Sequence, residues 1–316
     1  MAETPSRIVS GEAHDDSVLP FAVERLDLRG RLVRLGPTVD SILTKDAYPP
    51  LVARLLGEAA ALTVLLGSLL ESHGRFQLQT RSDGAVDMLV VDYDAPGRLR
   101  GYARWDEGRL AGAATPQALL GRGHLGLTIE REEDAARYQG VVPLEGESLA
   151  EAAHMYFRQS EQIPSFVKLA VAEVVTPAGR GWRAGGLLLQ YLPHGGAAVR
   201  DLAPGDAPAG AGIEETVDDS WDEGRALAAT IEDHELVDPG LSGERLLYRL
   251  FHERGVKVFP ERDVAEFCRC SDERVEKLLR SFSAEDRAYM TGDDGKIGVT
   301  CEFCRTKRSF DPGDFA

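Results

Sequence analysis

The sequence predicts a mixed α+β protein with an N-terminal core of sheet and helix, a helical linker and a small C-terminal domain. Three observations support this prediction. Several N-terminal segments alternate apolar and polar residues, as half-buried strands do, and one long segment is apolar on most of a helical surface. Further along the chain, apolar residues recur at near-helical spacing among many charges. All four cysteines lie within the last 49 of the 316 residues, which indicates a separate small domain.

The N-terminal strands are predicted from their period of two. The turn Ser82-Asp83-Gly84 joins two of them, because a short segment of small polar residues and glycine favours a chain reversal. The alternating positions are Phe76, Leu78 and Thr80, then Val86, Met88 and Val90, and later Val167, Leu169 and Val171.

One core helix is predicted over residues 51–70. Pro49 and Pro50 suit the first helical turn. Backbone N–H groups there have no partner within the helix, so the N–H that proline lacks is not needed. Leucines cover most of the helix surface, which is typical of a buried helix. Its longest uncharged run, residues 59–70, has 12 residues, fewer than the roughly 18 that a membrane span requires. We therefore expect a core helix and no membrane partner.

The middle of the chain is acidic and poor in large apolar side chains. Residues 196–216 are rich in Ala, Gly and Pro, and such a segment cannot bury enough surface to offset its chain entropy. We expect a mobile loop there. Amphipathic helices should follow it, carrying Trp221, Leu227 and Ile231 and then Leu246, Leu247, Leu250 and Phe251. Two interpretations of these helices stay open: ordinary packing on the N-terminal core, or part of a switch.

These features divide the chain into three predicted parts. Residues 1–200 form the α+β core, residues 201–266 the acidic loop and helical linker, and residues 267–316 the cysteine-containing domain.

The four cysteines are spaced as a tetrathiolate metal site. Cys268 and Cys270 form one close pair, and Cys301 and Cys304 form a Cys-x-x-Cys pair 30 residues later. Two such pairs supply the four soft ligands that zinc takes in tetrahedral geometry. In an extended backbone the side chains of Cys268 and Cys270 point the same way, so they can share a metal or be oxidised to each other. A plain structural zinc ribbon is the alternative.

Several longer segments resemble the heat shock protein 33 family of redox-regulated bacterial holdase chaperones. The cysteine segments are Phe267-Cys268-Arg269-Cys270-Ser271 and Val299-Thr300-Cys301-Glu302-Phe303-Cys304. Similar segments elsewhere are Leu28-Arg29-Gly30-Arg31, Tyr156-Phe157-Arg158-Gln159-Ser160-Glu161-Gln162-Ile163-Pro164-Ser165 and Leu247-Tyr248-Arg249-Leu250-Phe251-His252-Glu253. The resemblance covers nearly the whole chain, and the chain departs from the family in the acidic insert near residues 196–220 and in its long N-terminal lead.

The resemblance implies a sequence of events. In the reduced form one Zn²⁺ is held by the four cysteines. Oxidation then pairs Cys268 with Cys270 and Cys301 with Cys304, the metal leaves, the linker unfolds, and a homodimeric form binds unfolding client proteins without ATP. A reducing cytoplasm is the expected location, since residues 1–20 show no basic start and no apolar run of an export signal.

Other function classes fit the sequence less well. The net charge of −16 has the wrong sign for following a phosphate backbone, so we expect no nucleic-acid partner, although residues 271–279 and 283–286 could form a helix-turn-helix. A static zinc-ribbon interaction module is the alternative function. A thiol oxidoreductase that uses Cys301 and Cys304 is a third, weaker hypothesis, because no strand-to-helix redox fold is predicted around that pair.

Motifs of enzymes are missing or out of context. Residues 121–126 match a dinucleotide-binding fingerprint letter by letter, but Leu125, Leu127 and Ile129 alternate as in a strand, where that fold needs a helix. The sequence contains no Gly-x-Ser-x-Gly, no phosphate-binding loop and no His-Glu-x-x-His motif. We expect no catalytic residues and no enzymatic activity.

Overall fold

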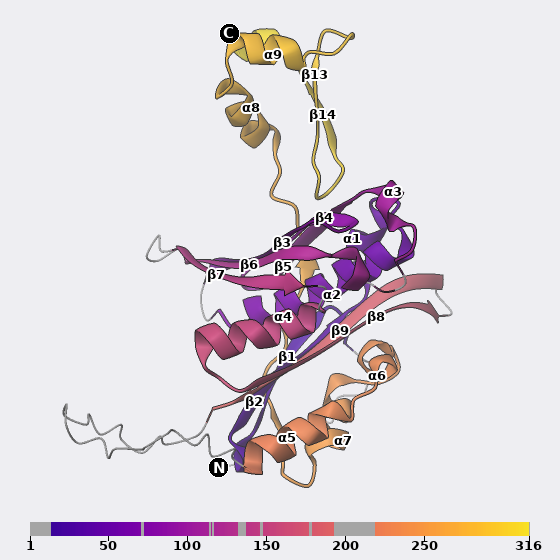
Figure 1. The fold of residues 1–316 in the computed structure, drawn as a ribbon, viewed down its shortest axis with the longest axis vertical. Coiled ribbons are helices and arrows are strands. Elements are labelled where there is room, and N and C mark those ends of the chain that lie inside the picture. Colours follow the sequence, from indigo (N-terminus) through magenta and orange to yellow (C-terminus); the bar gives the residue numbers. More distant parts are fainter. Residues whose placement is uncertain are drawn as a thin grey trace, which may run out of the picture.

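The protein is built in layers along its long axis (Figure 1). Linker helices lie at one end, followed by a first sheet, a layer of core helices, a second sheet and, at the other end, the segment that carries the cysteines. This arrangement confirms the predicted α+β class with a C-terminal cysteine cluster. The computed structural model describes residues 14–70, 73–113, 115, 117–131, 137–145, 148–176, 179–192 and 219–315.

The first sheet, sheet A, has the strand order β10-β1-β2-β9-β8, and β11 also pairs with β1. Every pairing in it is antiparallel among the described residues. The predicted strand around residues 167–171 lies within β8. The bounds are β1 Ser17–Val23, β2 Leu28–Leu35, β8 Ser165–Thr176, β9 Gly179–Tyr191, β10 Lys257–Val258 and β11 Arg262–Asp263.

The second sheet, sheet B, has the order β12-β5-β4-β3-β6-β7. The predicted strands 76–80 and 86–90 lie in β3 and β4, joined at residues 82–84 as expected. Residues 125–129 lie in β6, so the glycine-rich segment before them leads into a strand. The bounds are β3 Gly74–Ser82, β4 Val86–Asp94, β5 Arg98–Trp105, β6 Arg122–Arg131, β7 Arg137–Glu145 and β12 Ala265–Glu266.

Core helices fill the space between the sheets. Helix α2 (Pro50–Gly67) contacts strands of both sheets, and α1 (Pro37–Thr44) and α4 (Leu149–Tyr156) lie beside it, while the short α3 (Glu107–Leu110) follows β5. By length and composition α2 alone among the described helices could span a membrane, but 78% of it is buried inside the protein. Its apolar surface is therefore explained by the core, as the sequence predicts.

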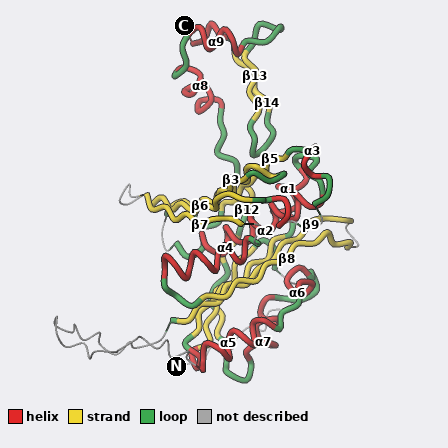
Figure 2. The backbone as a smooth tube through the Cα atoms, viewed as in Figure 1, coloured by secondary structure: helices red, strands yellow, loops and turns green. Residues whose placement is uncertain are grey.

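The linker helices cover the outer face of sheet A (Figure 2). They are α5 (Asp219–Ala229), α6 (Asp233–Val237) and α7 (Gly243–Phe251). Their apolar residues form one buried cluster with side chains of β1, β2 and β9. The predicted helices are thus present and packed on the core, as the ordinary-packing interpretation expects. The predicted loop at residues 196–216 lies outside the described residues.

Two glycines allow the closest approach of the linker to sheet A. A Cβ atom on Gly224 of α5 would lie 2.2 Å from Cδ1 of Leu28. A Cβ atom on Gly185 of β9 would lie 2.3 Å from the carbonyl oxygen of Leu236 in α6. Because any side chain at these positions would collide with its neighbour, the linker sits against the sheet with no spare room.

After α7 the chain runs back along both sheets. Val258 of β10 pairs with Phe21, and Arg262 of β11 pairs with Val18 of the same strand. Ala265 of β12 then pairs in parallel with Arg98 of sheet B. These short pairings connect the linker directly to the cysteine segment. The boundaries at residues 200 and 266 remain a prediction.

Residues 267–315, called here the cysteine module, have a small apolar core of their own. Helices α8 (Asp272–Arg280) and α9 (Ala284–Met290) begin at the capping residues Ser271 and Ser283. A hairpin of β13 (Ile297–Thr300) and β14 (Lys307–Phe310) follows. The buried cluster consists of Leu279, Ile297, Phe310 and Phe315. So few buried side chains stabilise a module of this size only weakly.

Candidate metal centre

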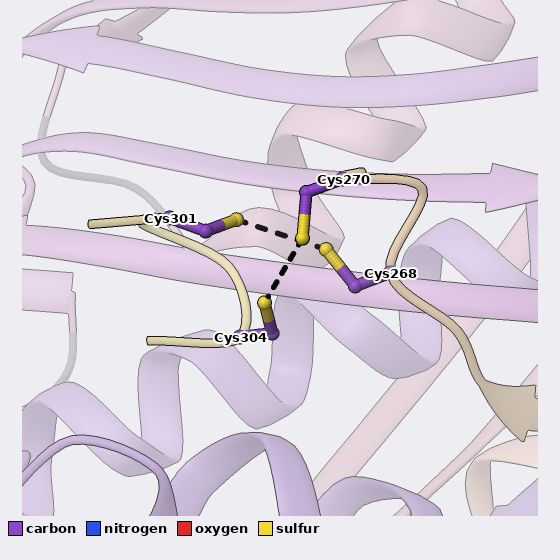
Figure 3. A group of neighbouring side chains, drawn as sticks. All are labelled: Cys268, Cys270, Cys301 and Cys304. Carbon is purple, nitrogen blue, oxygen red and sulfur yellow. Dashed lines mark hydrogen bonds between the residues drawn. The ribbon is translucent and has the colours of Figure 1, made fainter. Parts of the chain in front are cut away.

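The four predicted ligands meet at one point. Cys268 and Cys270 follow β12, and Cys301 and Cys304 lie in the loop between β13 and β14 (Figure 3). Their sulfur atoms all lie within 4.8 Å of one another. Two sulfur–sulfur contacts join the different segments: Cys268 to Cys301 at 3.7 Å and Cys270 to Cys304 at 3.3 Å. The cluster therefore ties the start of the module to its hairpin.

The hairpin loop is shaped to turn two thiols toward the same point. The backbone N–H of Cys301 donates to the Thr306 carbonyl at 3.0 Å, and the N–H of Arg305 donates to the Cys301 carbonyl at 2.8 Å. Arg305 adopts a φ of 57°, in the left-handed region that tight turns use. These bonds close the Cys-x-x-Cys segment into a compact turn, so both sulfurs face the first pair.

The sulfur positions fit a tetrahedral ion. Zinc–sulfur bonds of about 2.3 Å in tetrahedral geometry place neighbouring sulfurs about 3.8 Å apart. The Cys268–Cys301 distance of 3.7 Å is close to this value, and the Cys270–Cys304 distance of 3.3 Å is shorter. Each cysteine is partly buried. The four thiols are thus positioned to hold a metal ion.

The thiols differ in acidity. Burial raises the pKa of Cys270 and of Cys301, and shared sulfur hydrogen bonds add to this rise at Cys270. Burial acts in the same direction on Cys304, but hydrogen bonds with Thr306, Cys270 and Cys301 together outweigh it and lower the pKa of Cys304 to about 6. Cys304 therefore ionises more readily than Cys270 and Cys301, and thiolates are the form that binds metal and reacts with oxidants.

Basic side chains surround the cluster. Burial lowers the pKa of Lys45, while the four cysteines raise it. Lys45 pairs with Glu266, the residue two before Cys268, and the hydroxyl of Ser41 donates to the same carboxylate at 2.6 Å. Positive charge close to several thiolates offsets their mutual repulsion.

A buried carboxylate on sheet B anchors the module beside the cysteines. Asp92 of β4 is 1% exposed. It accepts hydrogen bonds from Arg100 at 2.5 Å, Arg75 at 2.9 Å and Gln77 at 2.7 Å, all on sheet B, and from Arg269 of the module at 3.2 Å. Burial raises the pKa of Asp92, but Arg100 and Arg75 outweigh burial and hold the pKa below its usual range. Arg269 lies between two of the cysteines, so Asp92 holds the metal centre itself against the sheet.

Phe303 supplies the apolar part of the same contact. Its ring meets Tyr102 edge-on with centroids 4.8 Å apart, and the Arg100 guanidinium lies 3.9 Å from the ring centroid. The neighbouring Arg305 forms ion pairs with Asp46 of the core and with Glu302. Each pair of cysteines therefore encloses a residue that contacts sheet B: Arg269 in the first pair and Phe303 in the second.

Sequence reasoning located the cysteines but missed their docking partners. Asp92 and Arg269 are separated by 177 positions, and a lone aspartate in a strand has no motif that identifies its partner. A weak signal was present: Asp92 stands in an otherwise apolar run of β4, where an acidic residue needs a buried partner.

Comparisons with known proteins identify the family and the fold. A family model described as Hsp33 protein matches residues 16–311. The 33 kDa chaperonin of Caulobacter vibrioides (strain NA1000 / CB15N) is 46% identical over 304 residues, which cover 94% of this chain and 95% of that protein. The 33 kDa chaperonin of Pseudomonas syringae pv. syringae (strain B728a) is 37% identical over 297 residues, covering 94% and 91%.

A solved structure has the same fold. The crystal structure of the 33 kDa chaperonin (heat shock protein 33 homolog) from Thermotoga maritima aligns with a TM-score of 0.75. The alignment covers 96% of this chain and 97% of that chain at 20% identity. At that identity the likeness concerns the fold.

Proposed function

The chain belongs to the Hsp33 family of chaperones, and on this basis we propose that it is a redox-regulated holdase that binds unfolding proteins without ATP. The observation that carries the proposal is the position of the four thiols. They lie where the segment leaving the linker meets sheet B, so a change at the sulfurs acts on the joint between the linker and the module.

In the reduced form, we propose, Cys268, Cys270, Cys301 and Cys304 hold one Zn²⁺. Four thiolates form a closed set of soft ligands that suits a structural zinc site. The ion would supply stability: structural zinc contributes about 10–16 kcal/mol apparent at neutral pH. The module has only four buried apolar side chains in its described residues, so its fold would depend on the ion.

Oxidation is proposed to remove the ligands. Each disulfide forms from two thiolates that give two electrons to an oxidant such as hydrogen peroxide, whose O–O bond breaks and which takes two protons from solvent to become two water molecules. The pairing inferred from the family, Cys268 with Cys270 and Cys301 with Cys304, leaves the two segments unconnected. The alternative pairing across the contacts between the segments, Cys268 with Cys301 and Cys270 with Cys304, would keep the two segments covalently linked. A switch that unfolds the module requires the first pairing.

The loop closed by a Cys268–Cys270 disulfide is very short, so it restricts the unfolded chain little and cannot replace the stability of the metal. Loss of the module's fold would release Arg269 from Asp92 and Phe303 from Tyr102. The segment that carries β10 to β12 would then lose its anchor on sheet B. The linker helices that precede this segment would lose that support and keep their packing on sheet A.

Release of the linker would expose an apolar surface for clients. The outer face of sheet A presents Phe21, Leu28 and Leu187, all at most 1% exposed while the linker covers them. Exposed apolar area of this kind is what a holdase needs, since its attraction for unfolded chains requires no nucleotide. A net charge of −16 helps such a form stay soluble. We propose further that it acts as a homodimer in the cytoplasm.

A static zinc-ribbon interaction module is the alternative, in which the metal only stabilises residues 267–315. An aggregation assay separates the two. The full chain is added, reduced or peroxide-treated, to a thermally unfolding client, and light scattering is followed without nucleotide. The switch predicts suppression by the oxidised form alone. Equal suppression by both forms, or by neither, favours the static module.

A further inference from the structure

A cleft separates the edge of sheet B from the beginning of the cysteine module. It has a volume of about 900 Å³. One wall comes from sheet B and the segment before it, the other from the module. The side chains that matter here are His73, Arg75, Arg98, Arg131, Arg269 and Arg274.

The cleft is basic although the protein is strongly acidic. Five arginines line it, against the two carboxylates Asp94 and Glu130, in a chain of net charge −16. Arg75 forms ion pairs with Asp92 and Glu130, and Arg269 forms ion pairs with Asp92 and Asp94. Among the described residues, Arg98, Arg131 and Arg274 have no carboxylate partner, and Arg98 instead lies 4.4 Å from the centroid of the Phe267 ring. Three guanidinium groups at the cleft are therefore available to an added anion.

Unused hydrogen-bond donors lie at the same place. The Nε atoms of Arg75 and Arg269 are buried, and neither has a hydrogen-bond partner within the described part of the chain. Buried donors without partners carry a cost, and both of these side chains line the cleft. Ser271, which caps the start of α8, also lines the cleft. The positive end of that helix dipole therefore adds to the positive electrostatic potential in the cleft.

The chemistry of these groups selects a class of ligand. Guanidinium forks match the oxygens of phosphate groups in bidentate geometry. Because the unpaired arginines come from β5 and β6 on one wall and from α8 on the other, a chain of phosphates can reach all three better than a single phosphate can. The volume is in the range of small-ligand sites.

We propose that this cleft binds a compact polyphosphate anion of two or three phosphate groups, held between sheet B and the cysteine module. Such a ligand bridges two parts that separate in the proposed oxidised form, so it binds the docked form better. By linkage it disfavours undocking, by about tenfold when the free ligand is at ten times its dissociation constant. This regulatory consequence rests on the proposed function, while the binding itself does not.

Binding is tested on the reduced, metal-loaded full chain by calorimetry with pyrophosphate and tripolyphosphate at constant ionic strength. We expect one site per chain, and at least tenfold weaker binding in the Arg131→Gln/Arg274→Gln double variant. Neither arginine has a carboxylate partner among the described residues, so the variant should stay folded, which circular dichroism checks. Arg29→Gln, an exposed arginine of sheet A, is the matched control and should bind as the unaltered chain does.

Three outcomes would overturn the assignment: no saturable binding, equal weakening in the Arg29→Gln control, or tighter binding of a ten-nucleotide single-stranded DNA than of tripolyphosphate. The consequence for docking is read separately by hydrogen exchange at residues 267–275, since phosphates chelate zinc and would confuse a zinc-release assay. Slower exchange there with ligand supports the bridge, and unchanged exchange in a saturated sample contradicts it. Failure of the redox switch would leave the calorimetric result intact.

Discussion

Replacing Asp92 with Asn is expected to loosen the cysteine module from sheet B. Asn keeps the size of the side chain but removes the charge that Arg75, Arg100 and Arg269 share. Removal of one partner from a buried ion pair costs about 3–5 kcal/mol, and part of that cost falls on Arg75 and Arg100 within the sheet. One hydrogen bond to a charged group contributes about 1.5–3 kcal/mol. We therefore assign about 2 kcal/mol to docking, which corresponds to a roughly 30-fold larger undocked fraction.

Hydrogen exchange of the reduced, metal-loaded protein measures this fraction. The N–H of Phe267 donates to the Leu99 carbonyl at 2.9 Å, and this bond should break when the module leaves the sheet. Its exchange rate should rise about 30-fold in Asp92→Asn, while amides of α2 stay protected. Zinc release under peroxide should accelerate as well if undocking exposes the thiols.

Asp87→Asn is the control. Asp87 lies on the same strand and pairs with Arg104 at 2.8 Å, but both side chains are exposed, and among the described residues neither forms an ion pair with the module. This variant should exchange as the unaltered protein does, because exposed ion pairs contribute little. Unchanged exchange at Phe267 in Asp92→Asn, or an equal rise in both variants, would refute the view that Asp92 anchors the metal centre.

Three further predictions concern the metal, the linker and pH. Cys301→Ser should lose most of its zinc, measured by metal analysis after dialysis, and full occupancy would exclude Cys301 as a ligand. Gly224→Ala places a methyl group against Leu28, which should weaken linker docking by about 1–3 kcal/mol. The reduced variant should then suppress client aggregation, and an inactive variant would argue against linker release. Burial, with a smaller contribution from Asp233, raises the pKa of Glu58 to about 7 from 4.5. The contribution of Glu58 to the free energy of unfolding is fully present below pH 4.5. It is lost as pH rises through 7, which lowers the free energy of unfolding by about 3 kcal/mol. Glu58→Gln should remove that pH dependence in urea unfolding, and an unaltered slope would contradict the assignment.

The sequence predicts those parts of the fold that have a local period. Alternation locates β3, β4 and β8, and the leucine-rich stretch locates α2, because in both cases the side chains that face the core repeat along the chain. Strands β10, β11 and β12 have two residues each, too few for any period. Their pairing depends on where the ends of the linker and the core happen to meet, so no local pattern indicates it.

The same contrast holds at the site. The chain has four cysteines, in two closely spaced pairs, and each pair supplies half of a four-ligand site. Cys268, Cys270, Cys301 and Cys304 could therefore be predicted as one cluster. Asp92 is one of 52 acidic residues, and its partner Arg269 is far away in sequence. The docking of the module onto sheet B, on which the proposed switch depends, is therefore visible only in three dimensions.

The most direct test of the switch follows zinc and chaperone activity in the same sample. The reduced full chain is titrated with peroxide, and each aliquot is divided between metal analysis and light scattering of a thermally unfolding client. We predict one zinc per chain at the start, and suppression of aggregation that rises in proportion to the zinc released. Complete zinc release without suppression, or full suppression while the zinc is still bound, would contradict the account.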